Sequence, residues 1–252
     1  MFSKIRLKYR EKFGFFLLEK LKNFAKTDKS LLSLFKCKEM KRLLFFWIYG
    51  LFFFVPMSGQ EASFFQTVIT DSVFSRINGV SYPEHCTTLL SDLRYLQVLH
   101  YNMEGEVCKG ELICHHSIAD DLLAIFKELY QAKYPIGRMV LVDEYDADDE
   151  ASMQANNTSA FNYRYISGTR RLSKHSQGLA IDINPLYNPY VRWRNGKRIV
   201  SPKGAEKYAD RSLSFPYKIT RDDLCYKLFK KYGFTWGGDW KNSKDYQHFE
   251  KK

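Results

Sequence analysis

Two histidines and an aspartate, widely spaced in the C-terminal part of the sequence, have the types and surroundings of metal ligands. Asp182 lies inside the short apolar run LAIDI, where an unpaired carboxylate would be costly to bury. His175 precedes it by seven residues across Gly178, and a turn at this glycine would fold the histidine back over the strand that carries Asp182. His248 is the best candidate for a third ligand. Two imidazoles and one carboxylate would leave one coordination position open for water, as catalytic zinc requires.

Zinc lowers the pKa of such a water to about 7 and polarises a carbonyl group. A base is also needed beside the water to take its proton. Asp245 lies three residues before His248 and is the candidate. Residues three apart on an ideal strand point to opposite faces. We therefore expect a turn at Asp245, with the strand beginning nearer His248.

Two extended motifs contain these four residues, and they resemble those of the LAS zinc peptidases, the superfamily of lysostaphin, D-Ala-D-Ala peptidases and hedgehog. The first motif is Ser-x-His-x-x-Gly-x-Ala-x-Asp at 173–182, and the second is Asp-x-x-His-Phe at 245–249. The resemblance extends over roughly residues 85–250. It is strongest to the branch that contains VanY-like D-Ala-D-Ala carboxypeptidases and L-alanyl-D-glutamate peptidases.

The resemblance implies that His175, Asp182 and His248 bind Zn²⁺ and that Asp245 acts as the base. The family also uses an arginine before the histidine motif to bind the substrate carbonyl or the oxyanion. Arg164 is the choice here, with Ser173 as a nearby hydrogen-bond donor. The neighbouring arginines at 170 and 171 are alternatives.

The implied reaction is hydrolysis of an amide bond in a peptidoglycan stem peptide, by a chain that acts as a monomer. The bond would be L-Ala-D-Glu, as for an endopeptidase, or terminal D-Ala-D-Ala, as for a carboxypeptidase. Carboxypeptidases more often have Glu at the base position, so Asp245 leans toward the endopeptidase. The alternative is a cell-wall-binding module whose zinc is structural, and the presence of Asp245 argues against it.

The implied fold is an α+β domain in which a small antiparallel sheet carries the zinc site and helices pack on one face. Apolar patterns predict strands and helices that do not alternate regularly, which also favours α+β over a doubly wound sheet. Ser117 and Thr220 are the expected helix caps. The expected strands are 93–102, 111–115, 138–145, 179–183 and 245–250, and the expected helices are 117–132 and 221–232.

The positive charge of the sequence is concentrated near its N-terminus. The formal net charge is +11, but residues 1–57 contain 13 Lys and Arg against 4 Asp and Glu, which leaves 26 basic and 24 acidic residues for the remainder. Binding to nucleic acid depends on neutralising phosphates with Lys and Arg. The nearly neutral remainder therefore predicts no nucleic-acid partner.

The basic N-terminal segment has the features of a targeting signal. Residues 43–57 form an apolar run of 15, shorter than the about 20 residues of a membrane-spanning helix. The run follows Met40-Lys41-Arg42, as in a secretory signal. We expect a basic extension at 1–39, untranslated if Met40 is the start, a signal peptide or signal anchor at 40–62, and the peptidase domain at 63–252. The domain would then be periplasmic or secreted, with contact to a membrane only through this segment.

Four cysteines follow the apolar run, at positions 86, 108, 114 and 225. Cys108 and Cys114 flank a predicted hairpin and could form a disulfide, and four free buried thiols are the alternative. His115 and His116 are adjacent. Neighbouring residues of a strand point to opposite faces, so we do not expect these two histidines to share an ion. The acidic run at 146–150 is expected to be a solvated loop.

Overall fold

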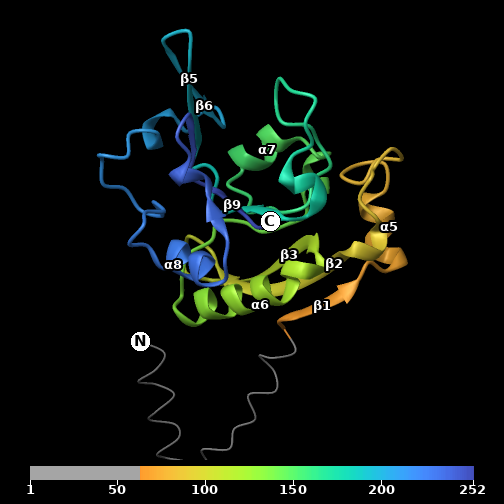
Figure 1. Ribbon diagram of the computed structural model, residues 1–252. Helices are drawn as coiled ribbons and strands as arrows, with labels where there is room; N and C mark the ends of the chain where they lie inside the picture. The colour runs from red at the N-terminus through yellow and green to blue at the C-terminus, as the bar shows by residue number, and fades with distance from the viewer. Residues whose placement is uncertain (1–62) are drawn as a thin grey trace, which may run out of the picture. The chain divides into compact units, whose positions relative to one another are not determined.

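The computed structural model describes residues 63–252 (Figure 1). The predictions for the basic extension and for the targeting signal fall outside these residues. Among residues 63–252, no helix is both long enough and apolar enough to cross a membrane.

Three antiparallel sheets of three strands each form the β part of the domain. The first has the order β1-β2-β3, the second β4-β9-β7 and the third β6-β5-β8. The strands are β1 (Phe65–Val68), β2 (Leu93–Tyr101), β3 (Val107–His115), β4 (Ala180–Asp182), β5 (Tyr190–Arg194), β6 (Lys197–Ser201), β7 (Thr235–Trp236), β8 (Ser243–Asp245) and β9 (His248–Glu250). The α+β class and the small antiparallel sheet were therefore predicted correctly.

Within residues 63–252, four α-helices and five short 3₁₀ turns connect the strands. The helices are α5 (Asp71–Ile77), α6 (His116–Gln131), α7 (Asp149–Gln154) and α8 (Leu224–Lys231). The turns are η1 (Leu90–Asp92), η2 (Val142–Tyr145), η3 (Lys174–Gln177), η4 (Glu206–Tyr208) and η5 (Gly237–Asp239). The long helix α6 runs along the first sheet, and the β5–β6 hairpin projects from the other end of the domain (Figure 1).

The largest core cluster joins α6, α8 and the second sheet. The buried residues of α6 recur at helical spacing and form one stripe, as the sequence pattern predicted. Phe229 of α8 stacks on Phe249 of β9, with ring centroids 4.3 Å apart. Burial of one such side chain stabilises the fold by about 1.5–3 kcal/mol. The core therefore fixes β9, the strand that begins at His248.

The two long helices begin at other residues than expected. The cap of α6 is His115, whose ring accepts from the Ser117 backbone N–H, so Ser117 lies inside the helix. The cap of α8 is Asp223, whose carboxylate accepts from Cys225 N, and Thr220 lies upstream. Both caps are polar side chains directly before the helix, where the first backbone N–H groups need hydrogen-bond acceptors.

Residues 138–145 do not form the predicted strand. The side chain of Asn157 occupies the hydrogen-bonding groups that a neighbouring strand would use: Val140 N donates to Asn157 Oδ1 at 2.9 Å, and Asn157 Nδ2 donates to Val140 O at 3.1 Å. Asn157 is fully buried. A buried amide thus satisfies the backbone here, and the segment continues into η2 instead.

The acidic run at 146–150 is a bonded structure rather than a solvated loop. Asp148 caps α7, and Asp149 pairs with Arg164 at 2.8 Å. Glu150 accepts from the Ser201 hydroxyl at 3.0 Å and from Lys203 N at 2.6 Å. This run therefore connects α7 to the segments around it.

Of the two alternatives for the cysteines, the Cys108–Cys114 disulfide is excluded. Both residues lie on β3, six positions apart, which separates them by about 20 Å at roughly 3.3 Å per residue. A disulfide requires Cα atoms within about 7 Å. All four cysteines of the described residues are free thiols, and Cys114 and Cys225 are buried.

Candidate active site

The three predicted metal ligands lie together in the interior of the domain. Asp182 ends β4 and His248 begins β9, and the register of the two strands places them directly opposite each other. Asp182 Oδ1 is 3.0 Å from His248 Nδ1, and Asp182 Oδ2 is 3.2 Å from His175 Nε2. His175 Nε2 is 3.2 Å from His248 Nδ1. All three side chains are buried.

His175 reaches this site from η3, a turn fixed at both ends. Ser173 caps its start, because the Ser173 hydroxyl accepts from His175 N at 3.3 Å. Gly178 ends it in a left-handed conformation, φ +66°. A Cβ on Gly178 would lie 2.6 Å from His115 N, so only glycine fits both the conformation and the space. The expected turn at Gly178 is present.

The second nitrogen of each imidazole is bound to an acceptor, which fixes the tautomer. His175 Nδ1 donates to the Ala160 carbonyl at 2.6 Å, and His248 Nε2 donates to Glu250 Oε2 at 3.1 Å. Each ring therefore keeps its other nitrogen, Nε2 of His175 and Nδ1 of His248, directed at the shared site. Histidines that bind metals have this arrangement almost always.

The segment that provides the Ala160 carbonyl also fixes Asp182. Ser159 forms an antiparallel bridge with Asp182, with Asp182 N donating to Ser159 O at 2.9 Å. Two residues on, the backbone N–H of Phe161 donates to Ile113 O of β3 at 2.9 Å. The segment 159–161 thus lies between the first sheet and the ligands. The sequence reasoning assigned no site role to Ala160, because a backbone carbonyl carries no mark in the sequence.

The donor set fits a metal ion. Ligands at about 2.0–2.2 Å from a tetrahedral Zn²⁺ lie about 3.3 Å from one another, close to the 3.0–3.2 Å found here. Burial alone would raise the pKa of Asp182, but the neighbouring imidazoles of His175 and His248 lower it well below its usual value. Burial would lower the pKa of His248, but hydrogen bonds to Asp182 and Glu250 raise it to about 10. The buried cluster therefore favours the ionised form of Asp182 and an additional positive charge. A cation site requires both properties.

Asp245, the predicted base, ends β8 as a half-buried residue whose Oδ1 atom is buried, close to the candidate ligand His248. Tyr246 and Gln247 separate it from the start of β9. The strand thus begins at His248 as predicted, whereas the chain turns after Asp245 rather than at it. Asp245 Oδ1 has no hydrogen-bond partner among the described residues. Burial and then the charge of Asp182 raise the pKa of Asp245 to about 7.

Gly237 allows Asp245 and His248 to approach each other. A Cβ on Gly237 would lie 2.7 Å from the Asp245 Cβ, 2.6 Å from the Asp245 carbonyl oxygen and 3.3 Å from the His248 Cβ. Trp236 packs in the core and donates its Nε1–H to Tyr246 O at 2.9 Å. The pair Trp236-Gly237 therefore supports the turn between the candidate base and the candidate ligand.

Arg164 and Ser173 lie beside the turn that carries His175. Ser173 N donates to Arg164 O at 3.0 Å, and Arg164 N donates to Ser176 Oγ at 2.8 Å. The Arg164 guanidinium pairs with Asp149, and its Nε is buried without a hydrogen-bond partner among the described residues. The two alternative arginines, Arg170 and Arg171, are exposed.

Glu250 is a further site residue that the sequence reasoning missed. It lies two positions after His248 on β9, so both side chains are on one face of the strand. The hydrogen bond to His248 lowers the pKa of Glu250, which keeps the carboxylate ionised. A carboxylate two residues after a candidate ligand was the signal available in the sequence.

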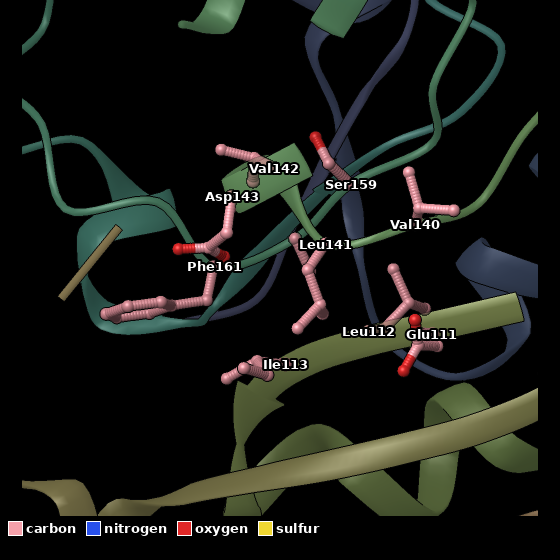
Figure 2. A pocket seen from close by; sticks show the side chains of 10 residues that line it. Glu111, Leu112, Ile113, Val140, Leu141, Val142, Asp143, Ser159 and Phe161 are labelled. Carbon is pink, nitrogen blue, oxygen red and sulfur yellow. The ribbon is translucent and has the colours of Figure 1, made fainter. Parts of the chain in front are cut away.

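A small cavity elsewhere in the domain does not contribute to this site. It has a volume of about 10 Å³ and lies between β3, the start of η2 and residues 159–161 (Figure 2). Its walls are largely apolar, with Glu111, Asp143 and Ser159 at the edges. This volume is near the lower limit for one water molecule, so the cavity cannot hold a substrate.

Comparison with known proteins identifies the C-terminal segment. Residues 167–251 match the family model described as D-alanyl-D-alanine carboxypeptidase. No curated protein and no solved structure matched the chain. The matched segment contains all three candidate ligands and Asp245, and the resemblance that the two motifs predicted is confirmed there: residues 167–251 carry the sequence pattern of the D-alanyl-D-alanine carboxypeptidases, a family of zinc peptidases of the LAS type.

Proposed function

We propose that this protein is a zinc-dependent peptidase that hydrolyses an amide bond in peptidoglycan stem peptides. The observation that carries the proposal is the pairing of two features in one buried site. One is the cluster of His175, Asp182 and His248, whose atoms are set to share an ion. The other is Asp245, a half-buried residue next to that cluster, whose buried Oδ1 has no hydrogen-bond partner among the described residues. A merely structural metal site has no use for the second feature.

The residues of the site divide the reaction between them. When bound, Zn²⁺ lowers the pKa of a water molecule and polarises the scissile carbonyl. Asp245 takes the proton of the attacking water and later delivers it to the leaving amine. His175, Asp182 and His248 hold the ion and leave one position open. The charge of the cation favours the ionised form of Asp245, which is the form that a base must have.

Arg164 is the proposed binding group for the substrate carbonyl or for the developing oxyanion. Its backbone is hydrogen-bonded to the η3 turn, and its guanidinium retains an Nε–H donor without a partner among the described residues. A fixed cation beside the reacting carbonyl would stabilise negative charge in the transition state. Ser173 contributes by capping η3 and is the second candidate for a substrate contact.

The site itself says less about which amide bond is cut than about the type of reaction. The matched family model is that of carboxypeptidases for D-alanyl-D-alanine, whereas an aspartate as base leans toward cleavage of L-Ala-D-Glu. Both substrates are peptides of the cell wall, and both would use the same four residues. The apolar run at 43–57, preceded by basic residues, supports export of the enzyme to the compartment that contains this substrate.

Digestion of defined muropeptides tests the proposal. The full-length protein is incubated with a pentapeptide stem and analysed by mass spectrometry, with and without a metal chelator. Loss of one terminal D-Ala indicates a carboxypeptidase, and cleavage after L-Ala indicates the endopeptidase. Either product should disappear with chelator and return with added Zn²⁺. Binding of peptidoglycan without cleavage would reject the proposal and favour a wall-binding module with a structural zinc.

A further inference from the structure

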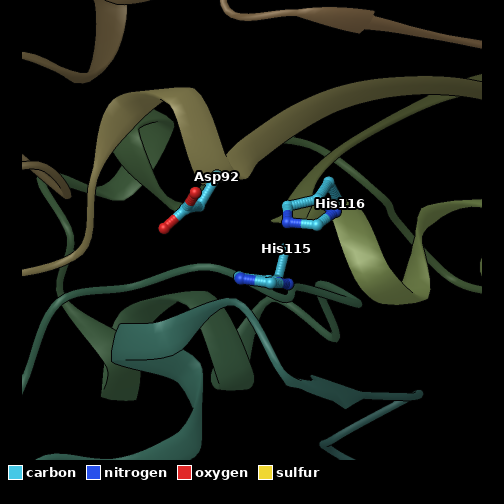
Figure 3. A group of neighbouring side chains, drawn as sticks. All are labelled: Asp92, His115 and His116. Atoms are coloured by element: carbon cyan, nitrogen blue, oxygen red, sulfur yellow. The ribbon is translucent and has the colours of Figure 1, made fainter.

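A second group of metal-binding side chains lies outside the active site, where β2 begins and β3 ends. Asp92 ends η1, directly before β2, and His115 ends β3. His116 begins α6. One ligand atom from each of these three residues lies within 4.8 Å of the others. Figure 3 shows the carboxylate and the two imidazole rings gathered at this junction.

The expectation that His115 and His116 do not share an ion rested on a strand geometry that these two residues do not have. It assumed that both residues continue one strand, in which neighbours point to opposite faces. The chain instead changes from strand to helix between them. The two rings consequently stack, with centroids 4.4 Å apart and an interplanar angle of 30°.

We propose that Asp92, His115 and His116 form a second site for a divalent transition-metal ion. Two imidazoles and one carboxylate suit zinc, nickel or copper, whereas magnesium and calcium prefer oxygen ligands alone. His115 Nδ1 is 2.8 Å from the Ser117 hydroxyl. An ion at Nε2 of His115 requires the tautomer that carries its proton on Nδ1, and the Ser117 hydroxyl can accept this proton, as in other metal sites. The His116 side chain is exposed, so an ion can reach the site from solvent.

The same surroundings make this site weaker than the one around Asp182. Without an ion, His115 Nδ1 instead accepts from Ser117 N at 3.2 Å to cap α6, so binding of an ion at Nε2 replaces this cap hydrogen bond. The positive end of the α6 dipole opposes a cation. The charge of Asp92 and screening by solvent offset the lost cap and the helix dipole only in part. In the first site, by contrast, His175, Asp182 and His248 are all buried.

A backbone hydrogen bond connects the second site to the first. His115 N donates to Gly178 O at 2.9 Å, and Gly178 ends the turn that carries His175. An ion at the second site would restrain His115 and, through this bond, the end of η3. Occupancy of the second site is therefore expected to stabilise the protein to heat as well as to add an ion.

The test is a titration of the full-length, metal-free chain with Ni²⁺ and with Zn²⁺, followed by calorimetry and by metal analysis of the gel-filtered protein. Wild type should bind two ions, one tight and one weak. His116→Ala should weaken the second ion by at least about 10-fold, the loss typical of disturbing a metal's surroundings, and should leave the tight ion in place. Asp92→Asn should have the same effect. Asp182→Asn should remove the tight ion and retain the weak one.

His85→Ala is the matched control, because His85 is also an exposed histidine and lies outside both clusters. It should leave both ions unchanged. His116 makes no cap, so its variant is expected to fold, and retention of the tight ion verifies this. One ion per chain in wild type would overturn the proposal. So would a weak ion that persists in His116→Ala, or one that His85→Ala weakens equally.

Discussion

Asp182 and His248 are direct partners across the β4–β9 pair, and their side chains approach to 3.0 Å between Oδ1 and Nδ1. Residues opposite each other in an antiparallel pair have Cβ atoms about 4.5–5.5 Å apart. The spacing of these two ligands is therefore set by the hydrogen bonds of a sheet rather than by a loop. Such a site is preorganised, because the backbone need not move when an ion enters.

Asp245→Asn should abolish hydrolysis while the metal content stays at one tight ion. The amide cannot accept the proton of water, and general bases contribute about 10²–10⁴-fold to the rate. The rate of muropeptide cleavage and the zinc content of the same preparation are the measurements. Unchanged cleavage in this variant would rule out Asp245 as the base, and loss of zinc would show a structural role instead.

Gly237→Ala should reduce activity by about 100-fold, because a displacement near 1 Å can have this cost. The new methyl group would lie 2.7 Å from the Asp245 Cβ and would push the base from its place. Gly110→Ala is the control. Its close neighbour is the flexible end of Met139, at 2.6 Å, in a part of β3 remote from the ligands. Equal losses in the two variants would indicate general destabilisation.

Glu250→Ala should weaken zinc binding by about 10–100-fold, as expected when the acceptor behind a ligating histidine is removed. His248 Nε2 would lose its partner at 3.1 Å, and the ring would no longer be held in one tautomer. Glu250→Gln should be milder, because its amide oxygen can still accept. Competition with a zinc-binding dye measures the affinity. Identical affinities for wild type and the alanine variant would contradict this role.

His100 should contribute stability to the metal-free protein that is lost as the pH falls below about 6.5. This side chain is buried, and burial lowers its pKa below the ordinary value of 6.5. The unfolded chain therefore takes up a proton at a higher pH than the folded chain does. The contribution of His100 is complete above the unfolded pKa and is lost as the pH falls toward the folded pKa.

His100→Gln tests this contribution, because glutamine does not titrate. Urea unfolding at pH 7.5 and at pH 5.5, both with chelator, gives the free energy of unfolding for each protein. The difference between the two pH values should be smaller for the variant than for wild type. An equal difference would show that His100 has no part in the acid sensitivity.

The sequence was sufficient to predict that the three candidate ligands lie together, because their neighbours are informative. A carboxylate within an apolar run, as at Asp182, needs a partner, and the two motifs supplied His175 and His248. It was insufficient wherever a distant residue decides the local structure. Residues 138–145 look like a strand until the amide of Asn157 is placed against Val140. Sheet pairing is equally non-local, so neither the β4–β9 register nor the Ala160 carbonyl could be derived.

The stretch from Ser159 to Phe161 sets a lower limit on the length of a working chain. It binds Asp182 on one side, orients His175 through the Ala160 carbonyl and is itself fastened to β3. The family model begins only at residue 167. A fragment cut to the matched segment would keep every candidate ligand but would lose the Ser159 bridge to Asp182 and the Ala160 carbonyl that orients His175. The smallest unit able to hold the ion in working geometry therefore includes the first sheet.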